Sequence, residues 1–142
     1  MRVPDFSPTD RLLMSDVQFL MPSSSPSSME INGIKVIQVP FSTYSRANPV
    51  YVYFQLYNLV RNNDGQTHFI TDYILTPIDA SQGEEGVLLQ KSDRSGKEEL
   101  SAEFAELDMR SIKPGRYTLS VRATDRYRVQ TIQRFRMIDL VE

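Results

Sequence analysis

One segment near the C-terminus constrains the fold of this chain more than any other. Residues 112–123 read IKPGRYTLSVRA, a Pro-Gly turn followed by strictly alternating apolar positions. Pro114 presets the backbone for a turn, and Gly115 accepts the left-handed conformation that follows. The next four apolar side chains share one face of an extended segment: Tyr117, Leu119, Val121 and Ala123. Such alternation predicts a β-strand that is buried on one face.

The tyrosine directly after this turn is typical of the tyrosine corner found in Greek-key sandwiches. There the phenol donates a hydrogen bond to backbone a few residues upstream. We therefore predict that Tyr117 is substantially buried and that its hydroxyl bonds to backbone between Met109 and Pro114, because a buried phenol needs a partner.

The rest of the chain also reads as strands separated by turns. The strongest β pattern is 50–60, after Asn48-Pro49, and further strands are predicted at 12–21, 34–39, 68–75, 87–91 and 98–106, with a last strand carrying Phe135 and Met137. We expect hairpins across Asn62–Gly65 and across 92–96, with Leu100, Ala102 and Phe104 facing inward. About seven to eight strands without a convincing helix predict an all-β fold, an antiparallel immunoglobulin-like or fibronectin-III-like β-sandwich.

Composition bounds the domain organisation and the chemistry. The chain has 142 residues, no cysteine and a net charge of −2, so thiolate and disulfide chemistry are excluded and no general attraction to nucleic acid is expected. We expect residues 1–11 to be a linker or lead-in, without a signal peptide, and 12–142 to be one sandwich domain with an exposed Ser/Pro-rich loop at 22–28. The longest apolar run is far short of the ~20 residues that span a bilayer, so no membrane span is expected.

Three segments, taken in order, resemble the C-terminal β-sandwich region of bacterial proteins named for a GWxTD motif: Leu13–Val17, Asn48–Leu59 and Leu107–Asp125. Together they span most of the chain, and the middle one is the most specific. The naming motif is absent, since the chain contains no Trp. The resemblance implies one excised domain of a longer, exported bacterial protein. It implies an extracytoplasmic location and supplies no catalytic residues.

The first candidate site is a tyrosine stripe. Tyr51, Tyr53 and Tyr57 lie opposite Val52, Phe54 and the other apolar residues of their strand. An exposed row of tyrosines can stack on sugar rings or anchor a protein partner. The alternative is that cross-strand neighbours or a flanking loop cover the rings, and we expect partial cover.

The second candidate site is a basic patch. Residues 79–108 hold nine acidic and three basic residues, whereas 109–138 hold eight basic and one acidic. If their side chains project outward together, four arginines form a surface for an acidic polymer or a phosphate: Arg116, Arg122, Arg134 and Arg136. The alternative is ordinary cross-strand pairing of these arginines with Glu99 and Glu103.

Catalytic and metal-binding patterns are weak. Asn62, Asp64 and Gly65 do not fit a calcium loop, because Val60 would then occupy the first ligand position. His68 is the only histidine, and we interpret it as solvent-facing or hydrogen-bonded. Asp79, Glu84, Glu85 and Asp93 could supply a carboxylate pair for glycoside hydrolysis, but their loop composition is generic. The sequence indicates no cofactor and no catalytic residues.

The hypothesis drawn from these patterns is a non-enzymatic accessory module of a larger bacterial protein. Its partner would be a neighbouring domain of the parent chain or another protein. Two alternatives stay open. One is a carbohydrate-binding module that uses the tyrosine stripe. The other is a sandwich-type protease inhibitor that presents loops, including Ser23–Ser25 and Gly83–Gly86.

Overall fold

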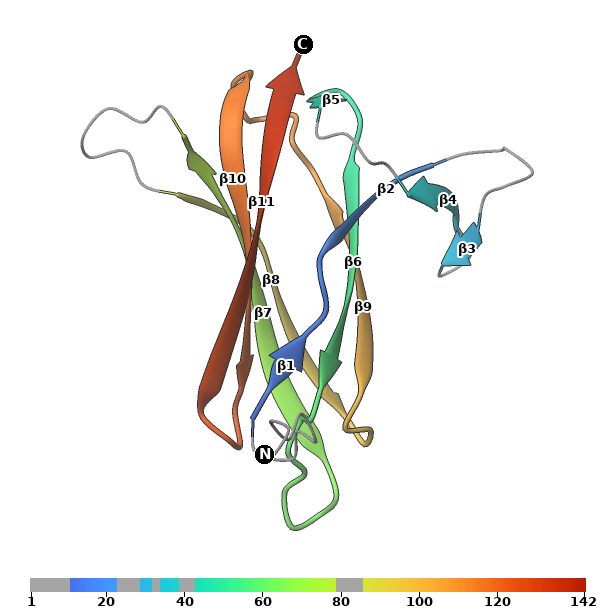
Figure 1. The fold of residues 1–142 in the computed structure, drawn as a ribbon, viewed down its shortest axis with the longest axis vertical. Helices are drawn as coiled ribbons and strands as arrows, with labels where there is room; N and C mark the ends of the chain where they lie inside the picture. The colour runs from blue at the N-terminus through green and yellow to red at the C-terminus, as the bar shows by residue number, and fades with distance from the viewer. Residues whose placement is uncertain (1–10, 23–28, 32–33, 39–42, 79–85) are drawn as a thin grey trace, which may run out of the picture.

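The computed structural model describes residues 11–22, 29–31, 34–38, 43–78 and 86–142, which form eleven strands in two sheets and no helix (Figure 1). Sheet A comprises β1 (Leu13–Met14), β2 (Gln18–Pro22), β3 (Met29–Ile31), β4 (Ile34–Gln38), β6 (Val50–Tyr57) and β9 (Ser101–Leu107). Sheet B comprises β5 (Thr43–Ser45), β7 (Thr67–Pro77), β8 (Val87–Gly96), β10 (Gly115–Asp125) and β11 (Gln130–Val141). The predicted all-β class is therefore confirmed, and nothing in the described ranges is a helix that could cross a membrane.

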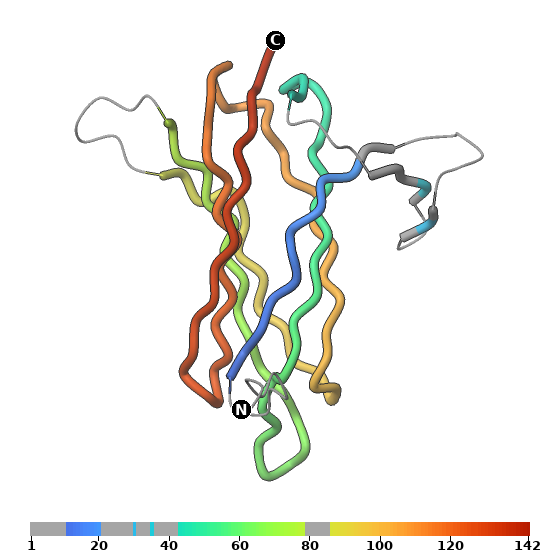
Figure 2. Tube along the Cα trace, viewed as in Figure 1, coloured from blue at the N-terminus to red at the C-terminus, as the bar shows by residue number. Residues whose placement is uncertain are grey.

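The strand order places β6 and β10 at the centre of their sheets. In sheet A, β6 pairs with β1 and β2 along one side and with β9 along the other, and β4 and β3 continue the sheet beyond β2. Sheet B runs β5-β11-β10-β7-β8. The pairing is antiparallel except between β5 and β11, which are parallel, so the expectation of a purely antiparallel fold needs this one correction. Figures 1 and 2 show the two sheets as two columns, with β1 and β2 between β11 and β6.

The core fills the space between the two sheets. Val52, Phe54 and Leu56 of β6 are fully buried, and so are Leu119 and Val121 of β10. Because side chains alternate along a strand, the other face of each sheet looks away from this core. The predicted faces of the strands at 50–60 and 115–123 are therefore both confirmed.

The tyrosine corner is present where it was predicted. Tyr117 Oη donates a 2.6 Å hydrogen bond to the Lys113 carbonyl, and the ring packs against the core. The side chain is half-buried rather than fully buried. Gly115, the first residue of β10, has a φ of 156°, a conformation that favours glycine.

Two predicted hairpins are wrong. The turn at 62–65 does not join paired strands, because β6 belongs to sheet A and β7 to sheet B. Asn58, with a φ of 68°, ends β6, and the chain then crosses between the sheets. The second predicted hairpin fails for the same reason. Residues 92–96 are part of β8 and form no turn, and the chain then crosses to sheet A before β9 begins. Turn chemistry is local and does not determine whether the second strand pairs with the first.

The predicted inner face of β9 is reversed. Leu100 and Ala102 are exposed and Phe104 is half-buried on the outer face, whereas Glu103 and Ala105 point inward. The reversal is possible because Phe104 finds apolar cover outside the core, against Tyr51. Leu107, Met109 and Ile112 are buried as the chain returns to sheet B.

The domain boundaries involve residues that are only partly described. The predicted lead-in, 1–11, lies outside the described residues except for Arg11, and β2 extends through Pro22. The remainder of the Ser/Pro-rich loop, 23–28, also lies outside them.

Candidate functional site

The tyrosine stripe lies on the outer face of sheet A. Tyr51 is only 7 % exposed, and its ring stacks on Phe104 with centroids 5.4 Å apart and planes 21° apart. Leu20 completes this small outer cluster, against which Tyr53 also packs. Burial raises the pKa of the Tyr51 phenol, and the nearby Glu106 carboxylate adds to that effect. The face of Tyr51 that could stack on a ligand is therefore taken by Phe104.

The other two tyrosines are half-buried and tied to their own strand. Tyr57 Oη donates to Gln55 Oε1 at 2.5 Å, and Gln55 Nε2 donates to Tyr53 Oη at 3.0 Å. The rings of the tyrosine stripe are therefore partly covered, as expected from the sequence. A glycan-binding platform on this face would have two available rings rather than three.

Two of the four arginines proposed as a basic patch point outward from sheet B. Arg122 donates to Asp72 Oδ2 at 2.9 Å, and Lys91 Nζ lies 3.6 Å from the other oxygen of the same carboxylate. Arg116 Nε lies 3.5 Å from Asp139 Oδ1. These two arginines therefore do form cross-strand ion pairs, as the alternative drawn from the sequence proposed. Their partners are Asp139 and Asp72, however, and not Glu99 or Glu103.

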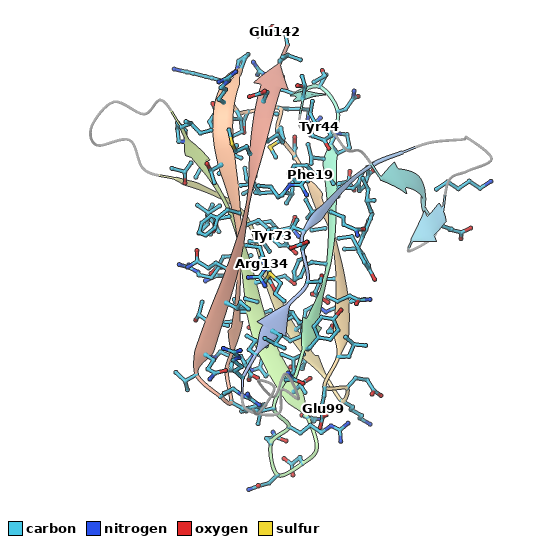
Figure 3. All side chains as sticks on the ribbon, viewed as in Figure 1. Phe19, Tyr44, Tyr73, Glu99, Arg134 and Glu142 are labelled. Atoms are coloured by element: carbon cyan, nitrogen blue, oxygen red, sulfur yellow. The ribbon has the colours of Figure 1, made fainter. Side chains whose placement is uncertain are left out.

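Arg134 and Arg136 point in the opposite direction, so the four arginines do not form one patch. In β11 they lie on the same inner face as Ile138 and Leu140. Their cross-strand neighbours in β10 are the buried Val121 and Leu119. Arg134 Nη2 donates to the Met14 carbonyl at 2.9 Å, and Arg136 Nη1 donates to the Val17 carbonyl at 2.7 Å. Figure 3 labels Arg134 and Phe19 between the two columns of strands. The sequence pattern misled because long cations at an open edge can reach backbone carbonyls of the other sheet.

Arginines close both long edges of the sandwich. At the β11 edge, Gln130 also accepts a 2.8 Å hydrogen bond from the Leu12 amide, so three side chains of β11 hold the backbone around β1 and β2. The Arg136 guanidinium also lies 4.7 Å from the centroid of the Phe19 ring. At the opposite edge, Arg94 of β8 lies 3.7 Å from Glu103 of β9. These charges therefore serve the fold rather than a ligand.

Glu103 and Tyr73 are both buried near that second edge. Burial raises the pKa of Glu103, while a 2.9 Å hydrogen bond from Ser101 Oγ and the charge of Arg94 oppose the rise. Burial also raises the pKa of Tyr73, and the Glu103 carboxylate adds to it. Both residues face the core, so their shifted pKa values reflect packing and do not mark an accessible catalytic acid.

The remaining candidates for chemistry are engaged in structural contacts. His68 Nε2 lies 2.6 Å from Asp93 Oδ1, as the hydrogen-bonded interpretation predicted. A cavity of about 330 Å³ opens beside the tyrosine corner, but its one phenol, Tyr117, is already bonded to Lys113. Among the described residues, no group of three or more acidic or histidine side chains is placed to hold a metal ion.

Sequence reasoning missed an apolar surface on the outer face of sheet B. Cross-strand register puts Phe135 of β11, Ser120 of β10, Ile74 of β7 and Leu88 of β8 in one row, and Met137, Thr118 and Thr76 in the next. We call these seven residues the sheet B patch. Phe135, Met137 and Leu88 are 62 %, 59 % and 53 % exposed. The signal was available in β11, where Phe135 and Met137 alternate with arginines, but the arginines were assigned to the outside.

More exposed apolar residues gather at the same end of sheet B. Ile78 and Val141 are each more than 40 % exposed and lie where β7 and β11 end, whereas Val87 is paired with the buried Leu75 and belongs to the other face. Large exposed side chains scattered singly are normal, whereas a contiguous group marks an interaction surface. The described residues contain nine exposed large hydrophobic side chains, and five of them are on or beside this outer face.

The loops proposed for an inhibitor lie mostly outside the described residues. Ser23–Ser25 lies outside the described residues. Residues 83–85, which include Glu84 and Glu85, also lie outside them. Asp79 lies there too, so no carboxylate pair for glycoside hydrolysis is described. At the described β10–β11 turn, Asp125 is fully buried and accepts hydrogen bonds from the amides of Val60, Tyr127 and Arg128. That aspartate anchors the turn.

No protein-family model matches this sequence, and no curated protein matches it. The function proposed below therefore rests on the surfaces of the molecule.

Proposed function

We propose that this chain is a non-enzymatic β-sandwich module of a larger bacterial protein, and that it docks on another protein surface through the outer face of sheet B. The observation that carries the proposal is the sheet B patch, in which Phe135, Met137 and Leu88 leave more than half of their surface in water. Burying such side chains on a partner is favourable by roughly 25 cal/mol per Å² of apolar area. Contiguous exposed apolar patches on monomeric proteins are often interaction sites.

The strand order supports a finer assignment of the fold. β2-β6-β9 faces β11-β10-β7-β8, which is the order A-B-E against G-F-C-C′ of a fibronectin-III-like sandwich. The tyrosine corner at the start of β10 fits the same arrangement. The resemblance to GWxTD proteins supports a setting within a longer, exported polypeptide.

Selection from a library of genomic fragments of the source organism, displayed on phage, tests the proposal. The fragments are selected on the immobilised wild-type chain and re-tested on a double variant, Phe135→Ser with Met137→Thr. Val129→Ser is the matched control, because Val129 is 83 % exposed at the opposite end of the sandwich. We expect enriched fragments to bind wild type and control alike and the double variant at least ten-fold more weakly.

Two outcomes would count against docking through sheet B. Either no fragment would depend on the patch, or the enriched fragments would bind the double variant as well as they bind wild type. The thermal midpoint of the double variant should stay within a few degrees of wild type, because surface substitutions usually change stability by less than ~0.5 kcal/mol.

A further inference from the structure

We propose that the cavity beside the tyrosine corner is a binding site for a small aromatic carboxylate. The ring of the ligand lies against the apolar walls of the cavity, and its carboxylate meets the ammonium group of Lys113 at the rim. This inference goes beyond docking through the sheet B patch, because the cavity is lined by the inner face of sheet B and shares no residue with that patch.

The walls of the cavity come from the inner face of sheet B and from the segment that leads into it. Cross-strand register sets Tyr117 of β10 beside Pro77 of β7, and Leu75 of β7 beside Val87 of β8. Residues 111–113, which belong to the link between β9 and β10, complete the lining. Most of these side chains are apolar or aromatic, as is typical of pockets for small organic ligands.

The exposure of Val87 shows that the domain core leaves this part of the inner face uncovered. Leu75, its cross-strand neighbour on the same face, is 1 % exposed, whereas Val87 is 49 % exposed. The link between β7 and β8, residues 79–85, reads DASQGEE and supplies no large apolar side chain. An apolar ligand in the cavity therefore removes from water an inward-facing side chain that is otherwise half exposed, which favours binding.

The volume of the cavity suits one aromatic ring with a short substituent. The cavity measures about 330 Å³, whereas an apolar cavity of roughly 150 Å³ is enough to bind benzene. The remaining volume leaves room for a short acidic chain that reaches the rim. The Tyr117 ring in the wall favours an aromatic over an aliphatic ligand, because two rings gain from an offset-stacked or edge-to-face contact.

The polar groups at the rim favour an anion. Lys113 has the only charged side chain of the lining, and none of the ion pairs in the described part of the chain includes it. Its carbonyl and the Tyr117 hydroxyl are already bonded to each other. The groups left for a ligand are therefore the Lys113 ammonium, carried on a flexible four-carbon stem, and the Ser111 hydroxyl. Both can donate hydrogen bonds to a carboxylate.

Titration of the labelled full chain with three matched probes tests this inference. Phenylacetate carries the ring and the carboxylate, phenylacetamide is its neutral counterpart, and phenethylamine carries a positive charge. The amine is included because residues 79–85 contain three carboxylates. Two-dimensional NMR should show shifts concentrated at Val87, Ile112 and Tyr117. We expect phenylacetate to bind with a dissociation constant on the order of 1 mM, at least three-fold more tightly than the amide.

Two variants and their controls separate the charge from the cavity. Lys113→Gln should weaken phenylacetate binding at least three-fold and remove its preference over phenylacetamide. Lys97→Gln, beyond the far end of β8, should change neither. Val87→Trp should abolish binding of all three probes by filling the cavity. The urea midpoint of each variant verifies that it folds, and the Lys113 pair tests the proposal even if Val87→Trp does not fold.

Several results would overturn the assignment. Equal binding of the acid and the amide would exclude a role for the ammonium group, as would equal losses in Lys113→Gln and Lys97→Gln. Tighter binding of the amine would reverse the charge preference. No shift at the cavity residues with tens of millimolar phenylacetate would exclude the site itself.

This proposal and docking through sheet B can fail separately. Phe135→Ser with Met137→Thr removes the sheet B patch and should leave phenylacetate binding unchanged. Lys113→Gln should leave the binding of the selected protein fragments unchanged.

Discussion

Replacing Arg136 with Met tests whether this residue is part of an outward basic surface or a tie between the two sheets. In the structure Arg136 donates to the Val17 carbonyl at 2.7 Å and lies over the Phe19 ring at 4.7 Å. Methionine retains much of the aliphatic stem and removes both polar contacts. The substitution therefore isolates the interactions of the guanidinium.

The expected loss follows from those two contacts. A hydrogen bond from a charged group contributes ~1.5–3 kcal/mol, and we use the lower end because Arg136 is only half-buried. The cation–π contact adds about 0.5–1 kcal/mol. We therefore expect Arg136→Met to lower the free energy of unfolding by roughly 2 kcal/mol and the thermal midpoint by about 4–8 °C.

Urea unfolding followed by far-UV circular dichroism measures the change, since the chain has no Trp for fluorescence. Arg116→Met is the matched control, because its ion pair with Asp139 is exposed and is expected to contribute less than ~0.5 kcal/mol. Amide exchange at Leu20, next to Phe19 in β2, should accelerate only in the Arg136 variant. Equal losses in the two variants would refute the inward placement of Arg136.

Three further predictions concern stability. Tyr117→Phe should cost about 1 kcal/mol by removing the hydrogen bond to Lys113, and an unchanged urea midpoint would contradict the tyrosine corner. Tyr51→Ala should cost about 3 kcal/mol because its ring is buried and stacked, whereas Tyr57→Ala should cost under ~1 kcal/mol; similar losses would contradict the unequal cover. Burial raises the pKa of Glu103 above its ordinary value of 4.5, so protonation favours the folded state. The free energy of unfolding of wild type should therefore rise relative to Glu103→Gln as the pH falls from 7 toward 4.5, and a constant or falling difference would exclude this effect.

The local features of this fold were predictable from the sequence. β6 and β10 form where β-branched and aromatic residues alternate with a period of two, and that period determines which side chains share a face. The tyrosine corner was predictable for the same reason, because the turn residues and the phenol are neighbours in the chain. The sheet B patch was predictable only in part. Alternation along the last strand puts Phe135 and Met137 on one face, but the sequence does not determine whether that face is inside or outside the sandwich.

The tertiary structure decided which strands pair and which face of each edge strand is buried. The turn after β6 looks like a hairpin locally, yet β7 joins the other sheet because long-range packing outweighs turn chemistry. At β9 and β11 both faces can bury apolar surface, so alternation alone is ambiguous. Glu103 and Arg136 point inward because partners on the opposite sheet, Arg94 and the Val17 carbonyl, satisfy their charges, and those contacts exist only after the two sheets have met.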